Sequence, residues 1–111
     1  MKAFIVSLLV LCGLSTAVYA EGYQADSERG LALATAQCES CHGNAVIAMA
    51  KQFPNLKGQK IAYLNKQLVD FKVGLRLDPL MQAQVSALSS EQLQDVALFY
   101  SQQVTPNLSA N

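Results

Sequence analysis

The sequence predicts a small all-α domain. Three segments of the chain place apolar residues at spacings of three and four, which is the repeat of an amphipathic helix. No segment shows the alternation of apolar and polar residues expected of a strand, and proline or glycine separates the helical segments. At 111 residues the chain is long enough for one such domain, and it contains no internal repeat.

The first helix is expected to begin after Asp26, whose carboxylate can cap its amino end. Its apolar stripe comprises Leu31, Ala34 and Cys38. Gly30 costs about 1 kcal/mol relative to alanine inside a helix. Either another helix approaches closely at this point or the glycine is incidental.

The second helix follows a turn punctuated by Pro54 and Gly58. It is expected to run from Gln59 to a stop at Gly74, because glycine is typical of helix C-termini. The apolar stripe of this helix comprises Ile61, Leu64, Leu68 and Phe71.

The last helix opens with Ser89 and Gln92 at the spacing of a capping box and is stopped by Pro106. Two stretches are expected to be loops: residues 43–53, with room for one helical turn, and residues 75–87 around Asp78-Pro79. The apolar positions assigned to the last helix are Leu93, Val96, Ala97, Phe99, Tyr100 and Val104.

Residues 1–20 have the three-part form of a secretory signal peptide, with Lys2 at the head, an apolar body and small residues before a cut after Ala20. Cleavage would leave residues 21–111 as the mature domain in the periplasm. The apolar body is shorter than the roughly 20 residues that span a bilayer, and an uncleaved anchor is the alternative. Cys12 would leave with the signal peptide.

A Cys-x-x-Cys-His stretch runs from Cys38 to His42. On a helix, thiols at i and i+3 share a face, where each can form a thioether to a haem vinyl group, and the adjacent imidazole can bind the iron. A thioredoxin-like redox pair would need a βαβ context, and a zinc site would need a second Cys/His cluster. The chain offers neither, because His42 is its only histidine and Cys12 its only other cysteine. The motif therefore predicts one haem c attached through Cys38 and Cys41.

Iron bound by one histidine has an opposite face to fill, and the chain has no second histidine. Met81 is the favoured second ligand, because it is far enough along the chain to cross to that face. Met49 lies close in sequence to His42 and is less suitable. A lysine or a water stays open as a further alternative.

The order of several short motifs along the chain also supports a haem-binding domain. Gly30 precedes the Cys-x-x-Cys-His stretch, and Met81 precedes the terminal helix. The remaining landmarks are Pro54-Asn55-Leu56-x-Gly58, Tyr63-Leu64, Phe71-x-x-Gly74-x-Arg76, Leu88-Ser89 and Val96-Ala97-Leu98-Phe99-Tyr100. Together they resemble the class I c-type cytochromes, especially the small exported single-haem bacterial ones, and the chain looks like one half of a dihaem relative. The resemblance implies the class I cytochrome c fold, with three main helices and loops wrapped around one covalently bound haem.

Carried over to this sequence, the resemblance implies thioethers from Cys38 and Cys41. It implies that His42 and Met81 are the two iron ligands. It further implies that the backbone carbonyl of Pro54 accepts a hydrogen bond from the ring of His42.

The same resemblance implies roles for further residues. Leu56 would pack on the haem, and Gly30 would lie where the first and last helices cross, against Phe99. Tyr63 and Arg76 are placed near a haem propionate by their position and residue type.

A haem with both axial sites filled has no open position for substrate, so the expected function is single-electron transfer and not catalysis. We expect a soluble periplasmic carrier whose partners are redox proteins: a membrane complex, an oxidase, a reductase or a dehydrogenase. One alternative is a haem relay subunit of a periplasmic dehydrogenase complex. Another, which requires Met81 to be absent from the iron, is a haem sensor or enzyme with an open distal site.

The charge pattern of the sequence indicates which kinds of binding partner to expect. A formal net charge of zero argues against nucleic acid, and membrane embedding is not expected after signal cleavage. Residues 51–76 are locally basic, with Asp70 as their only acid. This segment is either a solvated face or, if it rims the haem, a docking face for an acidic partner.

Overall fold

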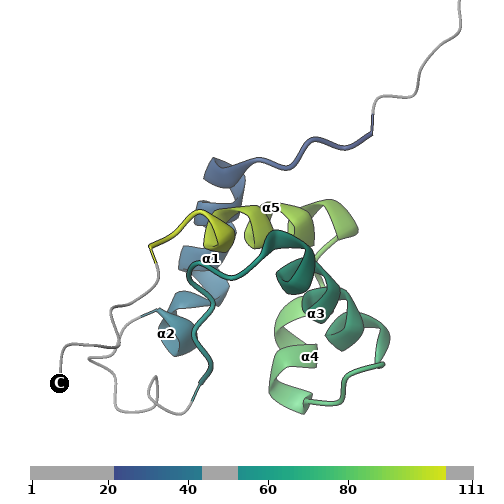
Figure 1. Cartoon of the computed structure of the whole chain (residues 1–111). Helices are drawn as coiled ribbons and strands as arrows, with labels where there is room; N and C mark the ends of the chain where they lie inside the picture. Colours follow the sequence, from purple (N-terminus) through teal and green to yellow (C-terminus); the bar gives the residue numbers. More distant parts are fainter. Residues whose placement is uncertain (1–21, 44–52, 105–111) are drawn as a thin grey trace, which may run out of the picture.

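The computed structural model describes residues 22–43 and 53–104, and within them it contains five helices and no strand (Figure 1). The predicted all-α class is confirmed for this part of the chain. The predicted signal peptide and Met49 lie outside the described residues. The helices are α1 (Ser27–Gln37), α2 (Glu39–His42), α3 (Ile61–Val73), α4 (Pro79–Val85) and α5 (Ser90–Ser101).

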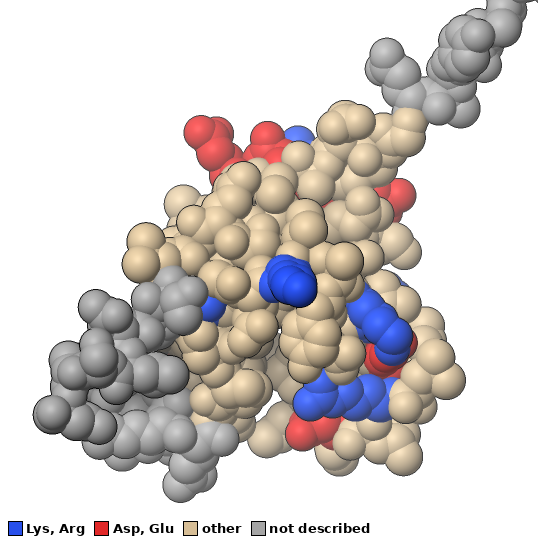
Figure 2. Space-filling model, viewed as in Figure 1, with Lys and Arg blue, Asp and Glu red and all other residues tan. Residues whose placement is uncertain are grey.

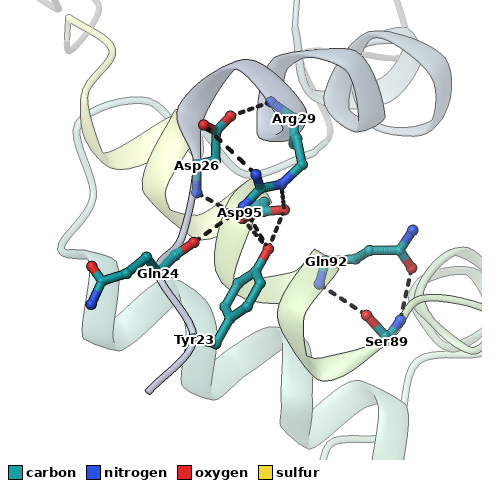
Figure 3. Close-up of polar contacts among 7 residues, drawn as sticks. All are labelled: Tyr23, Gln24, Asp26, Arg29, Ser89, Gln92 and Asp95. Carbon is teal, nitrogen blue, oxygen red and sulfur yellow. Dashed lines mark hydrogen bonds and ion pairs between the residues drawn. The ribbon is translucent and has the colours of Figure 1, made fainter. Parts of the chain in front are cut away.

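The helix ends follow the caps that the sequence predicts. The carboxylate of Asp26 accepts a hydrogen bond from the Arg29 backbone N–H at 2.8 Å, which caps α1. Ser89 and Gln92 form both halves of a capping box at the start of α5 (Figure 3). Gly74 ends α3 with a φ of +81°, a conformation that favours glycine.

Helix α5 lies across α1, and the contact between them is very close (Figure 1). A Cβ atom built at Gly30 would lie 2.7 Å from the backbone carbonyl carbon of Asp95 and 2.8 Å from Cβ of Phe99. The expectation that Gly30 meets Phe99 where these helices cross is therefore confirmed. The glycine is there because the α5 backbone occupies the space of a side chain.

The buried side chains form two clusters that share the partly buried Leu33 and Leu68. One cluster joins α1, α3 and α5 and comprises Ala34, Leu64, Val96, Ala97, Phe99 and Tyr100. The other joins α3, α4 and the start of α5 and comprises Phe71, Val85, Leu88 and Leu93.

Three residues assigned to apolar stripes are exposed, which corrects those predictions. Leu31 is 48% exposed because Gly30, its neighbour, and Ala34 form the face of α1 that meets α5. Ile61 is 42% exposed at the first position of α3. Val104 is 87% exposed because α5 ends at Ser101, before the predicted stop at Pro106.

The stretch expected to be a loop at residues 75–87 contains a helix, α4, so that prediction is wrong in part. The carboxylate of Asp78 accepts a hydrogen bond from the Met81 backbone N–H at 3.0 Å, and Pro79 occupies the first turn. An acidic cap followed by proline starts a helix readily, because proline lacks only an N–H that would be unpaired there. Met81 is consequently held on a helix and not in a loop.

Four residues connect the segment before α1 to α5 (Figure 3). We call them the Asp95 cluster: Tyr23, Asp26, Arg29 and Asp95. Asp95 is 2% exposed. Its carboxylate accepts hydrogen bonds from the Tyr23 hydroxyl at 2.7 Å, the Asp26 backbone N–H at 2.7 Å and Nε of Arg29 at 3.0 Å. A buried carboxylate with this many donors is stable only while it is ionised and all donors are in place.

The donors determine the protonation of Asp95. Burial alone would raise the pKa of Asp95, but the hydrogen bonds from Arg29, Asp26 and Tyr23 outweigh it and hold that pKa below its ordinary value. A carboxylate whose pKa is lowered by folding stabilises the fold above its unfolded pKa of about 3.9. That stabilisation is lost as pH falls through the lower folded-state pKa.

We predict that Gly30→Ala destabilises the domain by about 1 to 3 kcal/mol, because the new methyl group meets the α5 backbone and not a flexible side chain. Urea unfolding at pH 7 measures this. Gly22→Ala is the matched control, since a Cβ at Gly22 would have no heavy atom within 4 Å. Equal stability of the Gly30 variant and wild type would contradict the close crossing.

We also predict that Asp95→Asn lowers the free energy of unfolding at pH 7 by about 1 to 3 kcal/mol, because its donors lose a charged acceptor. As pH falls through the lowered folded-state pKa of Asp95, the gap between variant and wild type should narrow, since wild-type Asp95 also loses its charge there. Thermal or urea unfolding from pH 7 downward is the measurement. Glu91→Gln, an exposed change in the first turn of the same helix, should leave the pH dependence unchanged. A gap that does not vary with pH would contradict the role of the Asp95 charge.

Candidate haem site

One cavity brings together the six residues to which the sequence analysis assigns the attachment, iron binding and support of the haem. Its volume is about 290 Å³, at the lower end of the range for small-molecule sites. Its lining residues come from α2 and residues 53–59 for one part of it and from α3, α4 and α5 for the other. Figure 1 shows how these helices are arranged. The six residues are Cys38, Cys41, His42, Pro54, Leu56 and Met81.

The two cysteines lie at the start and within the single turn of α2, directly after α1. Backbone hydrogen bonds from Cys41 (3.2 Å) and His42 (2.9 Å) to the carbonyl of Cys38 close this turn. Neither thiol is in a disulfide. Burial, and then the Glu39 carboxylate, raises the pKa of the Cys38 thiol to about 11, which favours its protonated form in the folded domain.

The ring of His42 has one nitrogen engaged by the backbone. Its Nδ1 lies 2.8 Å from the carbonyl oxygen of Pro54, the contact that the resemblance implies. Because a carbonyl can only accept, Nδ1 carries the proton and donates it, which leaves the Nε2 lone pair available to a metal. Phe53 lies beside the same ring, with the centroids 5.9 Å apart.

Met81 lines the cavity from α4, a different wall from that of α2. It is partly buried and packs against the second core cluster, which limits its movement. The thioether is a neutral, soft ligand of the kind that haem iron accepts.

The other walls are mainly apolar and include Leu56, Leu68, Phe71 and Val96. Leu56 is partly buried against the first core cluster and faces the cavity.

A polar stretch interrupts the apolar walls. Arg76 donates to Oε1 of Gln67 at 2.6 Å, and its guanidinium lies 4.6 Å from the ring centroid of Phe71. Tyr63 also lines the cavity and is 51% exposed, at the solvent side. These groups suit the charged edge of a haem, while the apolar walls suit its body.

Sequence reasoning gave no site role to several residues of the cavity. Tyr100 was predicted as an apolar position of the last helix, and Gln67 was given no role, yet both line the cavity. No local pattern marks either residue, because each reaches the cavity only through the packing of its helix.

The alternative of a zinc site finds no support in the described residues. Among residues 22–43 and 53–104, no three His, Cys, Asp or Glu side chains are close enough to hold a metal ion. The free thiols, the imidazole with an open nitrogen, the thioether and the apolar walls fit a covalent haem together.

Comparison with known proteins decides the family. The family model described as cytochrome c matches residues 27–102, which include the Cys-x-x-Cys-His stretch, the cavity walls and Met81.

The chain belongs to the cytochrome c family.

Several curated proteins are similar to this cytochrome c. Cytochrome c4 of Pseudomonas aeruginosa is 38% identical over 103 residues, covering 93% of this chain and 49% of that protein. The thiosulfate dehydrogenase electron acceptor of Stutzerimonas stutzeri is 36% identical over 82% of this chain and 43% of its own length. Cytochrome c-554(548) of Halomonas halodenitrificans is 35% identical over 60% of this chain and 83% of its own length.

The chain spans about half the length of the first two relatives. This agrees with the resemblance to one half of a dihaem cytochrome. Membership of the family means a covalently attached haem c, and the chain has the class I cytochrome c fold. Within residues 22–43 and 53–104, no helix is both long and apolar enough to cross a membrane.

Covalent attachment through Cys38 and Cys41 predicts that acid and organic solvent leave the haem on the polypeptide. Mass spectrometry under denaturing conditions should give the chain plus one haem, and the double variant Cys38→Ala/Cys41→Ala should give the chain alone. Cys12→Ala is the matched control and should keep the haem. Wild-type protein that releases its haem into the solvent would contradict the attachment.

Proposed function

We propose that this cytochrome c is an exported carrier of single electrons in the periplasm, with His42 and Met81 as the axial ligands of its haem iron. The observation that carries the proposal is the placing of these two side chains on different walls of one cavity. The hydrogen bond from Nδ1 of His42 to Pro54 supports it, because this bond directs Nε2 away from the backbone.

Bound haem supplies an iron that alternates between Fe(III) and Fe(II). The chain's own residues set how readily it does so. Met81 is neutral, and the apolar side chains of Leu56, Phe71 and Val96 disfavour the extra positive charge of Fe(III). Both effects raise the reduction potential, which suits an electron carrier. Arg76 and Tyr63, at the polar edge, are proposed to approach a haem propionate.

Export is proposed from the first twenty residues, with their basic head, apolar body and small residues before Glu21. The domain then comprises residues 21–111. The mass spectrum that counts haem also determines the first residue of the native protein, which is expected to be Glu21.

One similarity favours a second candidate function, that of a relay for a dehydrogenase. The relative in Stutzerimonas stutzeri is named as the electron acceptor of a thiosulfate dehydrogenase. The present chain would then receive electrons from a catalytic partner and pass them on. Copurification from native cells, followed by identification of the bound protein, distinguishes a permanent subunit from a carrier.

The basic segment at residues 51–76 is a weaker guide to the partner. Figure 2 shows basic side chains gathered over the α3 side of the molecule with acidic ones beside them. Lys66 pairs with Asp70, and Lys72 donates to the Leu88 carbonyl. Both lysines therefore make contacts within the chain. Docking of an acidic partner on this segment stays a prediction, and the dependence of the electron-transfer rate on salt concentration tests it.

We predict that Met81→Ala opens the distal side of the haem. The low-spin spectrum of the wild type should give way to one with an exchangeable site, and the reduced protein should bind CO. The reduction potential should fall by roughly 0.1 V or more, since axial ligands set haem potentials over a range of about 0.8 V.

Met49→Leu is the matched control and should change neither the spectrum nor the potential. Ready CO binding by wild-type protein, or a Met81→Ala spectrum identical to wild type, would contradict His/Met ligation. Either result would favour a haem sensor or enzyme with an open distal site.

A further inference from the structure

Tyr100 connects α5 to both parts of the chain that hold the proximal side of the cavity. It is only 1% exposed, and its side chain lines the cavity. Its hydroxyl donates to Oε1 of Glu39 at 2.7 Å, across 61 positions of sequence. Its backbone carbonyl accepts a hydrogen bond from the N–H of Gly58 at 2.9 Å. Nothing in the roles assigned so far explains this pair of contacts.

The contact with Glu39 fixes α2. Glu39 lies between the two cysteines and begins this helix. Its carboxylate also packs against the turn that follows His42, since a Cβ built at Gly43 would lie 2.6 Å from the carboxyl carbon of Glu39. The Glu39 side chain is therefore enclosed between Tyr100 on α5 and the end of α2. A shift of α2 against α5 would have to break the hydrogen bond from Tyr100.

The contact with Gly58 fixes the segment that carries Pro54. Within this segment the side chain of Asn55 hydrogen bonds to both the N–H and the carbonyl of Lys57, at 3.2 and 3.0 Å. This makes a stiff turn whose position relative to α5 is set by the bond from Gly58 to Tyr100. Tyr100 thus contacts both the helix that carries His42 and the turn that follows Pro54, through its hydroxyl and its backbone carbonyl.

We infer that Tyr100 is the positioning residue for the proximal histidine. Its hydroxyl, acting through Glu39, holds α2 so that the ring of His42 keeps its orientation and its hydrogen bond to Pro54. The inference rests on the proposed function, in which His42 binds the iron. A fixed partner at Nδ1 sets both the plane and the basicity of a ligating imidazole, so Tyr100 controls the electronic state of the haem without touching the iron.

The hydroxyl is suited to a permanent donor role. Burial, and then the hydrogen bond to Glu39, raises the pKa of Tyr100 well above its ordinary value. This shift favours the protonated phenol, which is the form that donates to Glu39.

Tyr100→Phe tests the inference, because it removes the hydroxyl and keeps the ring and the backbone contact to Gly58. Two readouts report on His42 in the haem-loaded protein. The NMR shifts of the haem methyl groups in the ferric state depend on the plane of the axial imidazole, and the exchange rate of the Nδ1 proton with deuterium reports its hydrogen bond. We expect a changed methyl-shift pattern and exchange several-fold faster than in wild type.

Tyr23→Phe is the matched control. It also removes a phenol hydroxyl that donates to a carboxylate, that of Asp95, but Tyr23 does not line the cavity. This variant should lose stability and keep the wild-type methyl shifts and exchange rate.

Two substitutions of Glu39 distinguish the effect of its hydrogen bond with Tyr100 from the effect of its negative charge. Glu39→Gln keeps an oxygen acceptor for Tyr100, so the methyl shifts should stay near wild type while the reduction potential rises from the loss of a negative charge. Glu39→Ala removes the acceptor and should reproduce the shifts of Tyr100→Phe. Because Glu39 is only partly buried, this variant also keeps the test available should Tyr100→Phe fail to fold.

Unchanged methyl shifts and exchange in both Tyr100→Phe and Glu39→Ala would overturn the inference. So would an equal change in Tyr23→Phe, which would indicate a general effect of lost stability. Failure of the proposed function is distinguishable, because it would show in the wild type itself as a spectrum without histidine and methionine ligation.

Discussion

The rest of the structure depends on the close crossing of α1 and α5. At Gly30 the backbone of α5 takes the place of a side chain, and the Asp95 cluster fastens the same crossing with charged hydrogen bonds. Helix α1 runs directly into the Cys-x-x-Cys-His turn at Cys38, and Tyr100 of α5 lines the cavity. The distance between the two helices therefore decides where the two thiols and the imidazole of His42 lie.

The crossing leaves an interior that side chains alone do not fill. The two core clusters meet through Leu33 and Leu68, and the cavity lies between elements of both. A domain of this size buries only a modest apolar core. A large rigid group bonded to the chain therefore serves as part of that core. In the proposed function, the same apolar walls that stabilise the fold also raise the reduction potential of the iron. One group of residues would then set both stability and redox function.

The sequence was informative where the chemistry is local. The Cys-x-x-Cys-His stretch, the caps at Asp26 and Ser89, and the stop at Gly74 each depend on a few neighbouring residues, and the structure has all of them. The helix faces were less predictable. Leu31 is exposed because the close approach at Gly30, a tertiary contact, determines which side of α1 is buried. The contact between Tyr100 and Glu39 spans 61 positions and has no pattern in the sequence. Helix α4 was missed for a different reason, since its acidic cap and proline are also typical of a turn.

The hydrogen bonds that join the segment preceding α1 to helix α5 can form only late in the synthesis of the chain. Tyr23 and Asp95 are 72 positions apart, so the ribosome completes almost the whole domain before the two can meet. Until α5 is available, α1 lacks the partner that buries its Gly30 face, and α2 lacks the hydroxyl that holds Glu39. In a chain that has been synthesised only as far as α4, the Cys-x-x-Cys-His stretch therefore lacks the contacts with α5 that it makes in the folded domain.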